Sequence, residues 1–564
     1  MSGCADTTPP SAVPPEPADL IITDARIVTV DATLPEAEAM AIRGHRIVAV
    51  GSEQEVAVYQ SEDTQVLPVQ GRLVIPGFIE GHGHFLGLGR AQQILDLSSA
   101  ETFQDIVGQV AIAVDGLQPG EWIFGRGWHQ DKWQSLPVPN IDGTPLNDRL
   151  NVVAPENPVY LGHASGHAAI ANDAALQAAA IDHTTADPPG GKIVRTTAGK
   201  ATGLLRENAQ DLVAGAIQKD QARLTPEQRD INFREQIVLA GREAHRFGVT
   251  SFHDAGVDFA TLDLFKKLEA ERALPVRLYA MVRGERNDEM ASLLPKYRMI
   301  YENNDFLTVR SIKRQIDGAL GSHGAWLLEP YEDLDSTSGL VLEPEEEIER
   351  TAELALQHGF QVNTHAIGTR ANRVTLDIYE RAWRRSTVDT NNLRWRIEHA
   401  QHIHPDDVPR FGALGVIAAV QGVHCTSDGP WLASRLGQER TQATSYRWRD
   451  LLDTGATISN GTDVPVEPIN PIASFIASVS RRMKNGEVFY PDQAMTRMEA
   501  LRSYTLNNAF AAFEENEKGS ISPGKLADVV VLSKDIMRLP IDELQDTQVD
   551  FTILGGEVVY AREI

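Results

Sequence analysis

Histidines in this chain occur in local groups whose spacing suits a metal site. His82 and His84 stand two positions apart in the segment PGFIEGHGH, directly after a run of β-forming residues. Side chains at positions i and i+2 of a strand point to the same side, so both imidazoles can reach one ion. An HxH pair alone is a weak signal. Its place at the end of a strand strengthens it, because barrel enzymes carry their active sites at such ends.

Four further side chains also lie at or near the ends of β-like segments, later in the sequence. They are Lys313 in SIKRQID, His365 in VNTH, His399 in RIEH and Asp463 in NGTD. Each is ordinary by itself, since a lone histidine is usually a satisfied core residue and a lysine usually extends its amine to solvent. Together they supply imidazoles, an amine and a carboxylate, which is the ligand chemistry of zinc-type catalytic sites.

Alternating strand-like and helix-like segments must position these side chains. The strand-like segments are residues 73–75, 249–252, 276–281, 310–316, 361–364, 394–397, 416–420 and 456–459. Eight such segments, most of them followed by a helical stretch, predict an α/β fold with a TIM-like (β/α)₈ barrel over 74–517. The gap after the first segment is far longer than a normal crossover, so it predicts an inserted, helix-rich cap subdomain over about 86–230.

Both ends of the chain carry short β-rich runs broken by glycine-containing turns. Neither set holds enough strands for a stable sheet alone, so residues 19–73 and 518–564 are expected to form one composite β-sandwich domain. Residues 1–18 are rich in proline and poor in large apolar side chains, which predicts a disordered tail. This tail begins Met-Ser-Gly-Cys. The start is similar to a processed bacterial lipoprotein with Cys4 as its lipid site, and a chance cysteine in a flexible tail is the alternative.

Length and charge exclude several classes of protein. With 564 residues, the chain exceeds a single ordinary domain. Lys and Arg number 52 against 78 Asp and Glu, a net charge of −26 without a basic stripe, which argues against nucleic-acid binding. No run of about 18 apolar residues occurs, so no transmembrane segment is expected. A soluble bacterial-type enzyme is predicted, either cytoplasmic or exported as a lipoprotein, and the sequence leaves open whether it forms a homo-oligomer.

Several motifs together resemble the amidohydrolase superfamily, specifically the third amidohydrolase family, which includes N-substituted formamide deformylases. The motifs are PGFIEGHGH, KRQIDGALGS, NTHAIGTRANR, RIEHAQ, GTDVPVEPINP and KGSISPGKLADVVVLS. Their order matches from Asp19 to Tyr560. The resemblance implies a metal-dependent hydrolase that cleaves an amide-type C–N bond of a small molecule, such as an N-acyl, N-formyl or cyclic amide, with a metal-activated hydroxide.

The resemblance also implies roles for individual residues. It implies two Zn²⁺ per chain, bridged by a carboxylated Lys313, with Asp463 both a ligand and the catalytic carboxylate. His167 is expected to polarise the substrate carbonyl. The implied metal ligands are His82, His84, Lys313, His365, His399 and Asp463. The expected pocket residues are Trp128, His253, His424 and Asp428, with Glu207 able to orient His167 or Trp128. Glu80 stands where many relatives have aspartate.

Three alternatives remain beside this interpretation. One is a mononuclear-metal deaminase of a heterocycle, which would need no bridging lysine, so Lys313 argues against it. An esterase or lactonase would use the same ligands. A non-catalytic binding protein on the same scaffold would be expected to lack some of the six ligand positions, and all six are present.

Overall fold

A computed structural model describes residues 15–300, 305–390 and 392–563. The chain divides into two compact units, a terminal unit of residues 1–78 and 513–564 and a central unit of residues 79–512. Cys4 and most of the predicted tail lie outside the described residues. Within the described part of the chain, no helix combines the length and the apolar character needed to cross a membrane.

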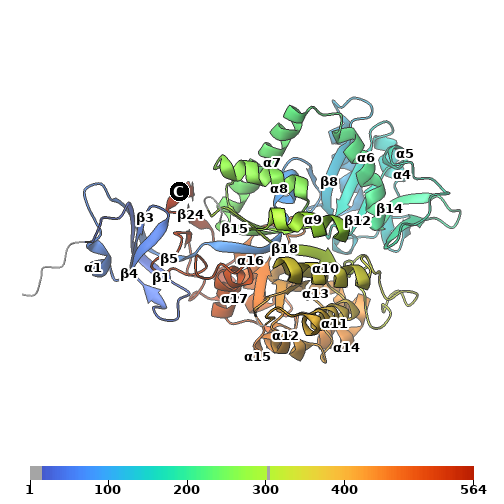
Figure 1. Cartoon of the computed structure of the whole chain (residues 1–564). Helices are drawn as coiled ribbons and strands as arrows, with labels where there is room; N and C mark the ends of the chain where they lie inside the picture. The colour runs from blue at the N-terminus through green and yellow to red at the C-terminus, as the bar shows by residue number, and fades with distance from the viewer. Residues whose placement is uncertain (1–14, 301–304, 391, 564) are drawn as a thin grey trace, which may run out of the picture. The chain divides into compact units, whose positions relative to one another are not determined.

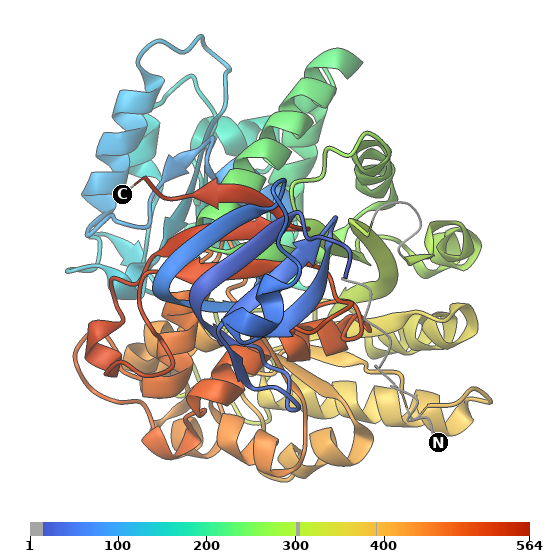
Figure 2. The ribbon, with the colours of Figure 1, turned by 90° about the vertical axis from the view of Figure 1, so that its left-hand side faces the viewer.

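Strands from both ends of the chain form one sheet in the terminal unit (Figure 2). Their order is β25-β24-β23-β5-β1-β3-β4, with β2 beside β1, and β5 pairs parallel to β1 and antiparallel to β23. Ile22, Ile42, Val74 and Val531 belong to its buried core. The sandwich stays a prediction, since the described strands form one continuous sheet. The elements are β1 (Leu20–Val28), β2 (Glu36–Ala37), β3 (Ala39–Arg43), β4 (Arg46–Gly51), α1 (Glu53–Ala57), β5 (Gln65–Pro76), β23 (Val529–Leu532), β24 (Val549–Leu554) and β25 (Glu557–Ala561).

Deleting residues 525–564 should make the protein insoluble. The deletion removes β23 to β25, so the residues of β5 that pair with Val529–Leu532 lose their partners and expose an apolar edge. The measurement is the soluble fraction after expression, followed by size-exclusion chromatography. Deleting only residues 563 and 564 serves as the control. A soluble, active product of the long deletion would contradict the pairing of the two ends.

Eight strands of the described central unit form a nearly closed barrel, which confirms the TIM-like α/β fold (Figure 1). The barrel strands in sheet order are β6 (Phe78–Gly83), β15 (Val249–Val257), β16 (Arg277–Val282), β18 (Leu307–Gln315), β19 (Gln361–Ala366), β20 (Arg396–His399), β21 (Ile417–Gln421) and β22 (Ile458–Gly461). A short strand, β17 (Met299–Ile300), pairs with β18. At the carboxyl ends of β6 and β22, the amide of Asp463 donates to the carbonyl of His82 at 2.8 Å, and the amide of His84 donates to the carbonyl of Val464 at 2.7 Å. These two bonds link the first strand of the barrel to the last.

The assignment of residues 73–75 as the first barrel strand was wrong. They belong to β5, where they pair with β23, and the barrel begins with β6 after Gly77. The apolar run continues across Pro76 and Gly77, so the sequence does not reveal where one sheet ends and the next begins.

Helices follow most barrel strands and pack on them. Helix α7 packs on β15, while α8 and α10 pack on β18 (Figure 1). The helices outside the cap are α2 (Phe85–Ala91), α7 (Pro226–Arg246), α8 (Phe259–Ala270), α9 (Asn287–Tyr297), α10 (Glu345–His358), α11 (Thr369–Arg385), α12 (Val408–Leu414), α13 (Gly422–Leu436), α14 (Gln438–Thr444), α15 (Trp448–Asp453), α16 (Pro471–Ser480), α17 (Arg497–Ser503) and α18 (Leu506–Ala511).

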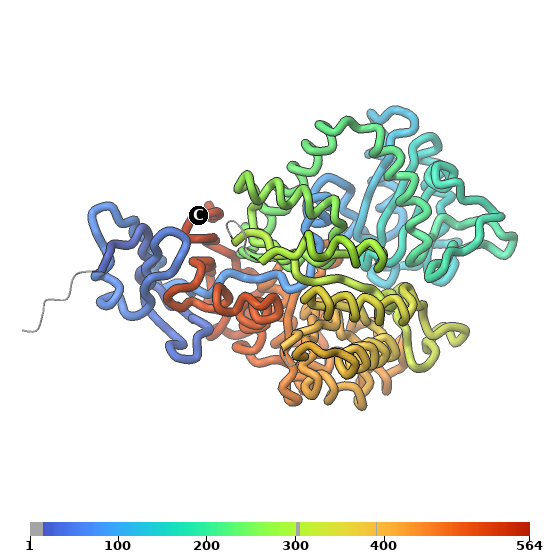
Figure 3. Tube along the Cα trace, in the orientation of Figure 1, coloured from blue at the N-terminus to red at the C-terminus, as the bar shows by residue number. Residues whose placement is uncertain are grey.

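The segment between β6 and β15, whose path Figure 3 traces, contains a six-stranded sheet in addition to the helices that the sequence predicts. Its strands are short and interrupted by glycines such as Gly125 and Gly127, which weakens the alternation that marks a strand. Its elements are β7 (Leu95–Asp96), α3 (Phe103–Val114), β8 (Ile123–Trp128), α4 (Asp148–Val153), β11 (Val159–His163), β12 (Ala168–Ala171), α5 (Asp173–Ala178), β13 (Gly191–Arg195), β14 (Ala201–Glu207) and α6 (Asp211–Gln221). A small separate hairpin pairs β9 (Asn140–Ile141) with β10 (Thr144–Pro145).

Candidate active site

All six candidate ligands line one cavity of about 420 Å³ in the central unit. They come from the carboxyl-terminal ends of five barrel strands: β6, β18, β19, β20 and β22. The six are His82, His84, Lys313, His365, His399 and Asp463. Parallel strands bring their carboxyl ends to one mouth, so residues distant in the sequence meet there.

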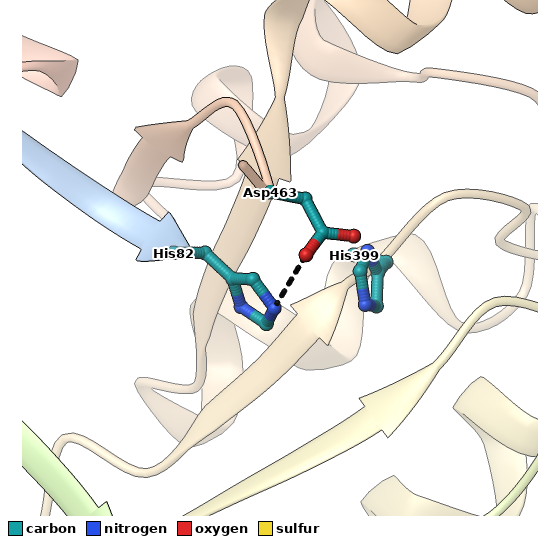
Figure 4. Close-up of side chains that lie close together, drawn as sticks. All are labelled: His82, His399 and Asp463. Atoms are coloured by element: carbon teal, nitrogen blue, oxygen red, sulfur yellow. Dashed lines mark ion pairs between the residues drawn. The ribbon is translucent and has the colours of Figure 1, made fainter. Parts of the chain in front are cut away.

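His82, His399 and Asp463 form the tightest group. One ligand atom from each lies within 4.8 Å of those of the other two (Figure 4). The Nε2 atom of His82 lies 3.6 Å from Oδ1 of Asp463, and Nε2 of His84 lies 3.3 Å from the same oxygen. His399 and Asp463 both adopt left-handed backbone conformations, with φ of 73° and 58°. Strained backbone conformations of this kind occur mostly at functional sites, where the surrounding structure holds them in place. Here they direct the side chains of His399 and Asp463 toward the same part of the cavity.

The imidazoles of the candidate ligands His82, His84 and His399 are neutral at neutral pH. Burial, followed by the charge of Lys313, lowers the pKa of His82, and burial lowers that of His84 to about 4. Burial is also the main reason why the pKa of His399 lies well below its usual value. Although burial opposes it, the contact with His84 and the other nearby histidines together hold the pKa of Asp463 well below its usual value. Neutral imidazoles beside an ionised carboxylate are the protonation states that a cation requires.

Lys313 and His365 complete this wall of the cavity. Burial, followed by the charge of Arg283, lowers the pKa of Lys313 to about 8. A larger fraction of this amine is therefore unprotonated at neutral pH than of an exposed lysine. The ring of His365 lies 4.3 Å from that of His399, and its Nε2 lies 3.6 Å from Oδ1 of Asp317.

Three buried ligand atoms have no hydrogen-bond partner: Nε2 of His82, Nε2 of His365 and Oδ1 of Asp463. Buried polar atoms are normally paired, since leaving one unpaired is unfavourable by about 1–3 kcal/mol. All three are electron-pair donors on the wall of the same cavity. A bound divalent cation would satisfy them, so the residues present fit a metal centre.

A buried ion-pair network behind His82 was missed from the sequence. Glu398 forms a short hydrogen bond with Nδ1 of His82, and Arg396 donates to both oxygens of Glu398 at 2.6 and 2.9 Å. Arg396 also donates to the carbonyl of Gly81 at 2.7 Å. Arg396 and Glu398 have no exposed surface. The sequence RIEH contained a sign of this network, because its two charged residues, Arg396 and Glu398, lie two positions apart and so share one face of a buried strand.

His167 reaches the cavity from the cap. Its Nδ1 lies 2.6 Å from Oε2 of Glu207, and Ser322 donates to the other oxygen of Glu207 at 2.9 Å. Although burial opposes it, the charge and hydrogen bond of Glu207 raise the pKa of His167. A Cβ on Gly318 or Gly324 would stand 2.3 or 2.2 Å from Oε1 of Glu207, so only glycine leaves room for this carboxylate.

The four expected pocket residues lie in three different places. His424 and Asp428 line a smaller cavity of about 60 Å³ that shares His167, His399 and Asp463 with the larger one. His253 is fully buried, and Arg396 lies 3.1 Å from its Nδ1. Trp128 is not among the residues that line either cavity, so its pocket assignment is corrected. It packs in the core of the cap, where its indole donates to Leu161 at 2.8 Å.

Comparison with known proteins gives matches over nearly the whole chain. The amidohydrolase family matches residues 65–560. Protein LONG AFTER FAR-RED 3 of Arabidopsis thaliana is 32% identical over 568 residues, which cover 98% of this chain and 93% of that protein. The N-substituted formamide deformylase of Arthrobacter pascens is 29% identical over 550 residues, 96% and 98% of the two chains. An uncharacterized metal-dependent hydrolase from Pyrococcus horikoshii has a TM-score of 0.73 at 26% identity, covering 93% and 99%.

Proposed function

Because the chain belongs to the amidohydrolase family, we propose that it hydrolyses an amide-type C–N bond of a small molecule. The observation that carries this proposal is the convergence of six ligand-type side chains on one cavity. Three of their electron-pair-donating atoms are buried and have no hydrogen-bond partner. An N-acyl, N-formyl or cyclic amide is the substrate class, and a relative that is 29% identical is an N-substituted formamide deformylase.

The six side chains would hold two divalent ions, for which the imidazole-rich set favours zinc. His82, His84, His365 and His399 would supply neutral nitrogen, and Asp463 would supply oxygen. Lys313, whose pKa is lowered to about 8, would react with CO₂ to form a carbamate and so change from a cation into an anionic oxygen ligand. The ions supply Lewis acidity and lower the pKa of bound water.

Side chains of the protein would carry out the proton transfers of this reaction. Asp463, ionised because its pKa is low, accepts a proton from the attacking water and delivers it to the departing nitrogen. His167, held by Glu207, donates from Nε2 to the carbonyl oxygen as negative charge develops there. Water adds to the carbonyl carbon and the C–N bond breaks, so the products are a carboxylic acid and an amine.

Metal analysis together with a substrate panel tests this function. We expect two divalent ions per chain in carefully purified protein, and turnover of at least one N-formyl, N-acyl or cyclic amide. The panel includes esters, lactones and amino-substituted heterocycles as the alternative substrates. Protein with one ion or none would contradict the binuclear centre. A metal-loaded protein that deaminates heterocycles but leaves every amide intact would contradict the bond type.

Glu398→Gln should weaken metal binding by about 10- to 100-fold, the usual effect of removing a carboxylate that orients a ligand histidine. The amide keeps the size of the side chain but loses the charge that holds Nδ1–H of His82 and directs Nε2 to the cavity. The measurement is a competition titration with a chelator. Glu380→Gln, which removes a carboxylate paired with Arg384 and Arg410, is the control. Unchanged affinity in Glu398→Gln would show that Arg396 and the strand alone fix His82.

A further inference from the structure

Two arginines line the cavity of the candidate metal ligands without a carboxylate partner. Arg126 lies on cap strand β8, and Arg283 follows barrel strand β16. Neither forms an ion pair with any residue that the structure describes. A guanidinium partly withdrawn from water without a counter-charge is unfavourable, so two in one cavity suggest a ligand that neutralises them.

Arg126 is held in place by neutral acceptors only. Its Nε donates to the carbonyl of Pro465 at 3.2 Å, and its Nη2 donates to Ala164 at 2.9 Å. Its Nη1 has no acceptor among the described residues, and Gly166, which has no side chain, lies beside it. The guanidinium is thus fixed, with one donor edge left for a ligand.

Arg283 stands on the barrel side of the same cavity. Its Nη2 donates to Oε1 of Gln315, which also lines the cavity. The charges of Asp211 and Glu343 act on it from beyond ion-pair distance, and Glu343 is itself paired with Arg314 at 3.4 Å. The positive charge of Arg283 is therefore only partly balanced by the protein.

The buried carboxylates of this cavity are already engaged, Glu207 by His167 and Ser322, and Asp463 by His84. The chain as a whole carries a net charge of −26, so these cations do not belong to a generally basic surface. Such a protein repels anions at long range, and local guanidinium groups must compensate if it is to bind one.

We propose that Arg126 and Arg283 form a subsite for an anionic group of the substrate, a carboxylate or a phosphate-type group. Arginine recognises both through its forked N–H donors. This inference rests on the proposed amide hydrolysis and narrows it to amides that carry an anion away from the bond that is cleaved. The two positions, on the cap and on the barrel, become determinants of specificity.

Three formamides that differ in one group test the subsite. They are the N-formyl derivatives of 4-(aminomethyl)benzoate, of its neutral carboxamide and of the corresponding phosphonate. We expect kcat/KM for the carboxylate to exceed that for the carboxamide by about tenfold or more, the scale of a charge-assisted hydrogen bond. The phosphonate shows which anion fits better. Equal kcat/KM values for the anionic and neutral compounds would overturn the proposal.

Substitutions test whether the two arginines cause the preference for the carboxylate substrate over the carboxamide. In Arg126→Gln and in Arg283→Gln, the carboxylate-to-carboxamide ratio should fall towards one. Gln315→Glu should do the same, because it gives Arg283 a carboxylate partner. Arg90→Gln is the matched control, since Arg90 lines the neighbouring cavity with Arg126 but not this one. A ratio that stays at the wild-type value in all three test variants would overturn the assignment.

Binding of the amine products separates this inference from the proposed function. If none of the three formamides is hydrolysed, amide hydrolysis fails, and calorimetric titration of the purified protein with the three amines still tests the subsite. We expect the anionic amines to bind at least tenfold more tightly than the neutral one, with the difference lost in the arginine variants. Equal affinities would overturn the subsite whatever reaction the protein catalyses.

Discussion

Asp463→Asn should lower kcat by a factor on the order of 10² to 10⁴, the usual contribution of a positioned acid or base. The two side chains are nearly isosteric, and the amide oxygen can still contact a cation. The amide cannot accept a proton at neutral pH, whereas the carboxylate of Asp463 is ionised because His84 and the neighbouring histidines lower its pKa. The measurement is steady-state kinetics on preparations whose metal content has been determined, and metal content should be largely retained.

His365→Ala is the matched comparison for this variant. It removes a ligand atom that is buried and without a hydrogen-bond partner, so both metal content and rate should fall. The two variants therefore separate proton transfer from metal binding. If Asp463→Asn keeps nearly full activity with its metals intact, Asp463 is not the proton acceptor, and His167 becomes the candidate for that step.

Lys313→Ala should lose the metal ions, and with them the activity. Lys313 is buried among four histidines and, once carboxylated, supplies the anionic oxygen that offsets the charge of two cations. Alanine leaves a space behind and no charge. We therefore expect a short carboxylic acid such as acetate or propionate, added at high concentration, to restore part of both metal content and rate. The measurement is elemental analysis beside kinetics, with and without the acid.

Lys267→Ala is the control for this experiment, because Lys267 lies half-exposed on α8 and pairs with Asp230. Its metal content and rate should match those of the wild type. Retention of two ions in Lys313→Ala would refute a bridging carbamate. A crystal structure of metal-loaded protein in which the lysine ends at a bare ammonium would refute it independently.

The sequence was sufficient for the barrel and the family, because both depend on local signals. Strand-like segments alternate with amphipathic helices, and the six ligand-type residues follow or lie within those segments, as in VNTH and RIEH. The family assignment is confirmed by the match over residues 65–560. The roles of His82, Lys313 and the other ligands stay predictions, because their convergence on one cavity does not establish metal binding.

Features that depend on contacts between distant segments could not be predicted. Residues 73–75 read as a barrel strand, since nothing local distinguishes pairing with β23 from pairing within the barrel. Trp128 was assigned to the pocket because its neighbourhood resembles that of relatives, yet its strand turns the indole into the core of the cap. The role of Glu398 required knowing that β20 brings it to His82, from the first strand of the barrel.

The bonds that join His82 to Asp463 and His84 to Val464 have a consequence for synthesis. During translation, the first strand of the barrel leaves the ribosome long before the last, and the group formed by His82, His399 and Asp463 is incomplete until β22 has emerged. A chain stopped anywhere before that strand therefore lacks the tightest group of the centre. Metal uptake by the proposed centre would therefore require a chain that extends past Asp463, and a metal-dependent gain in resistance to proteolysis should distinguish such chains from fragments that end before this residue.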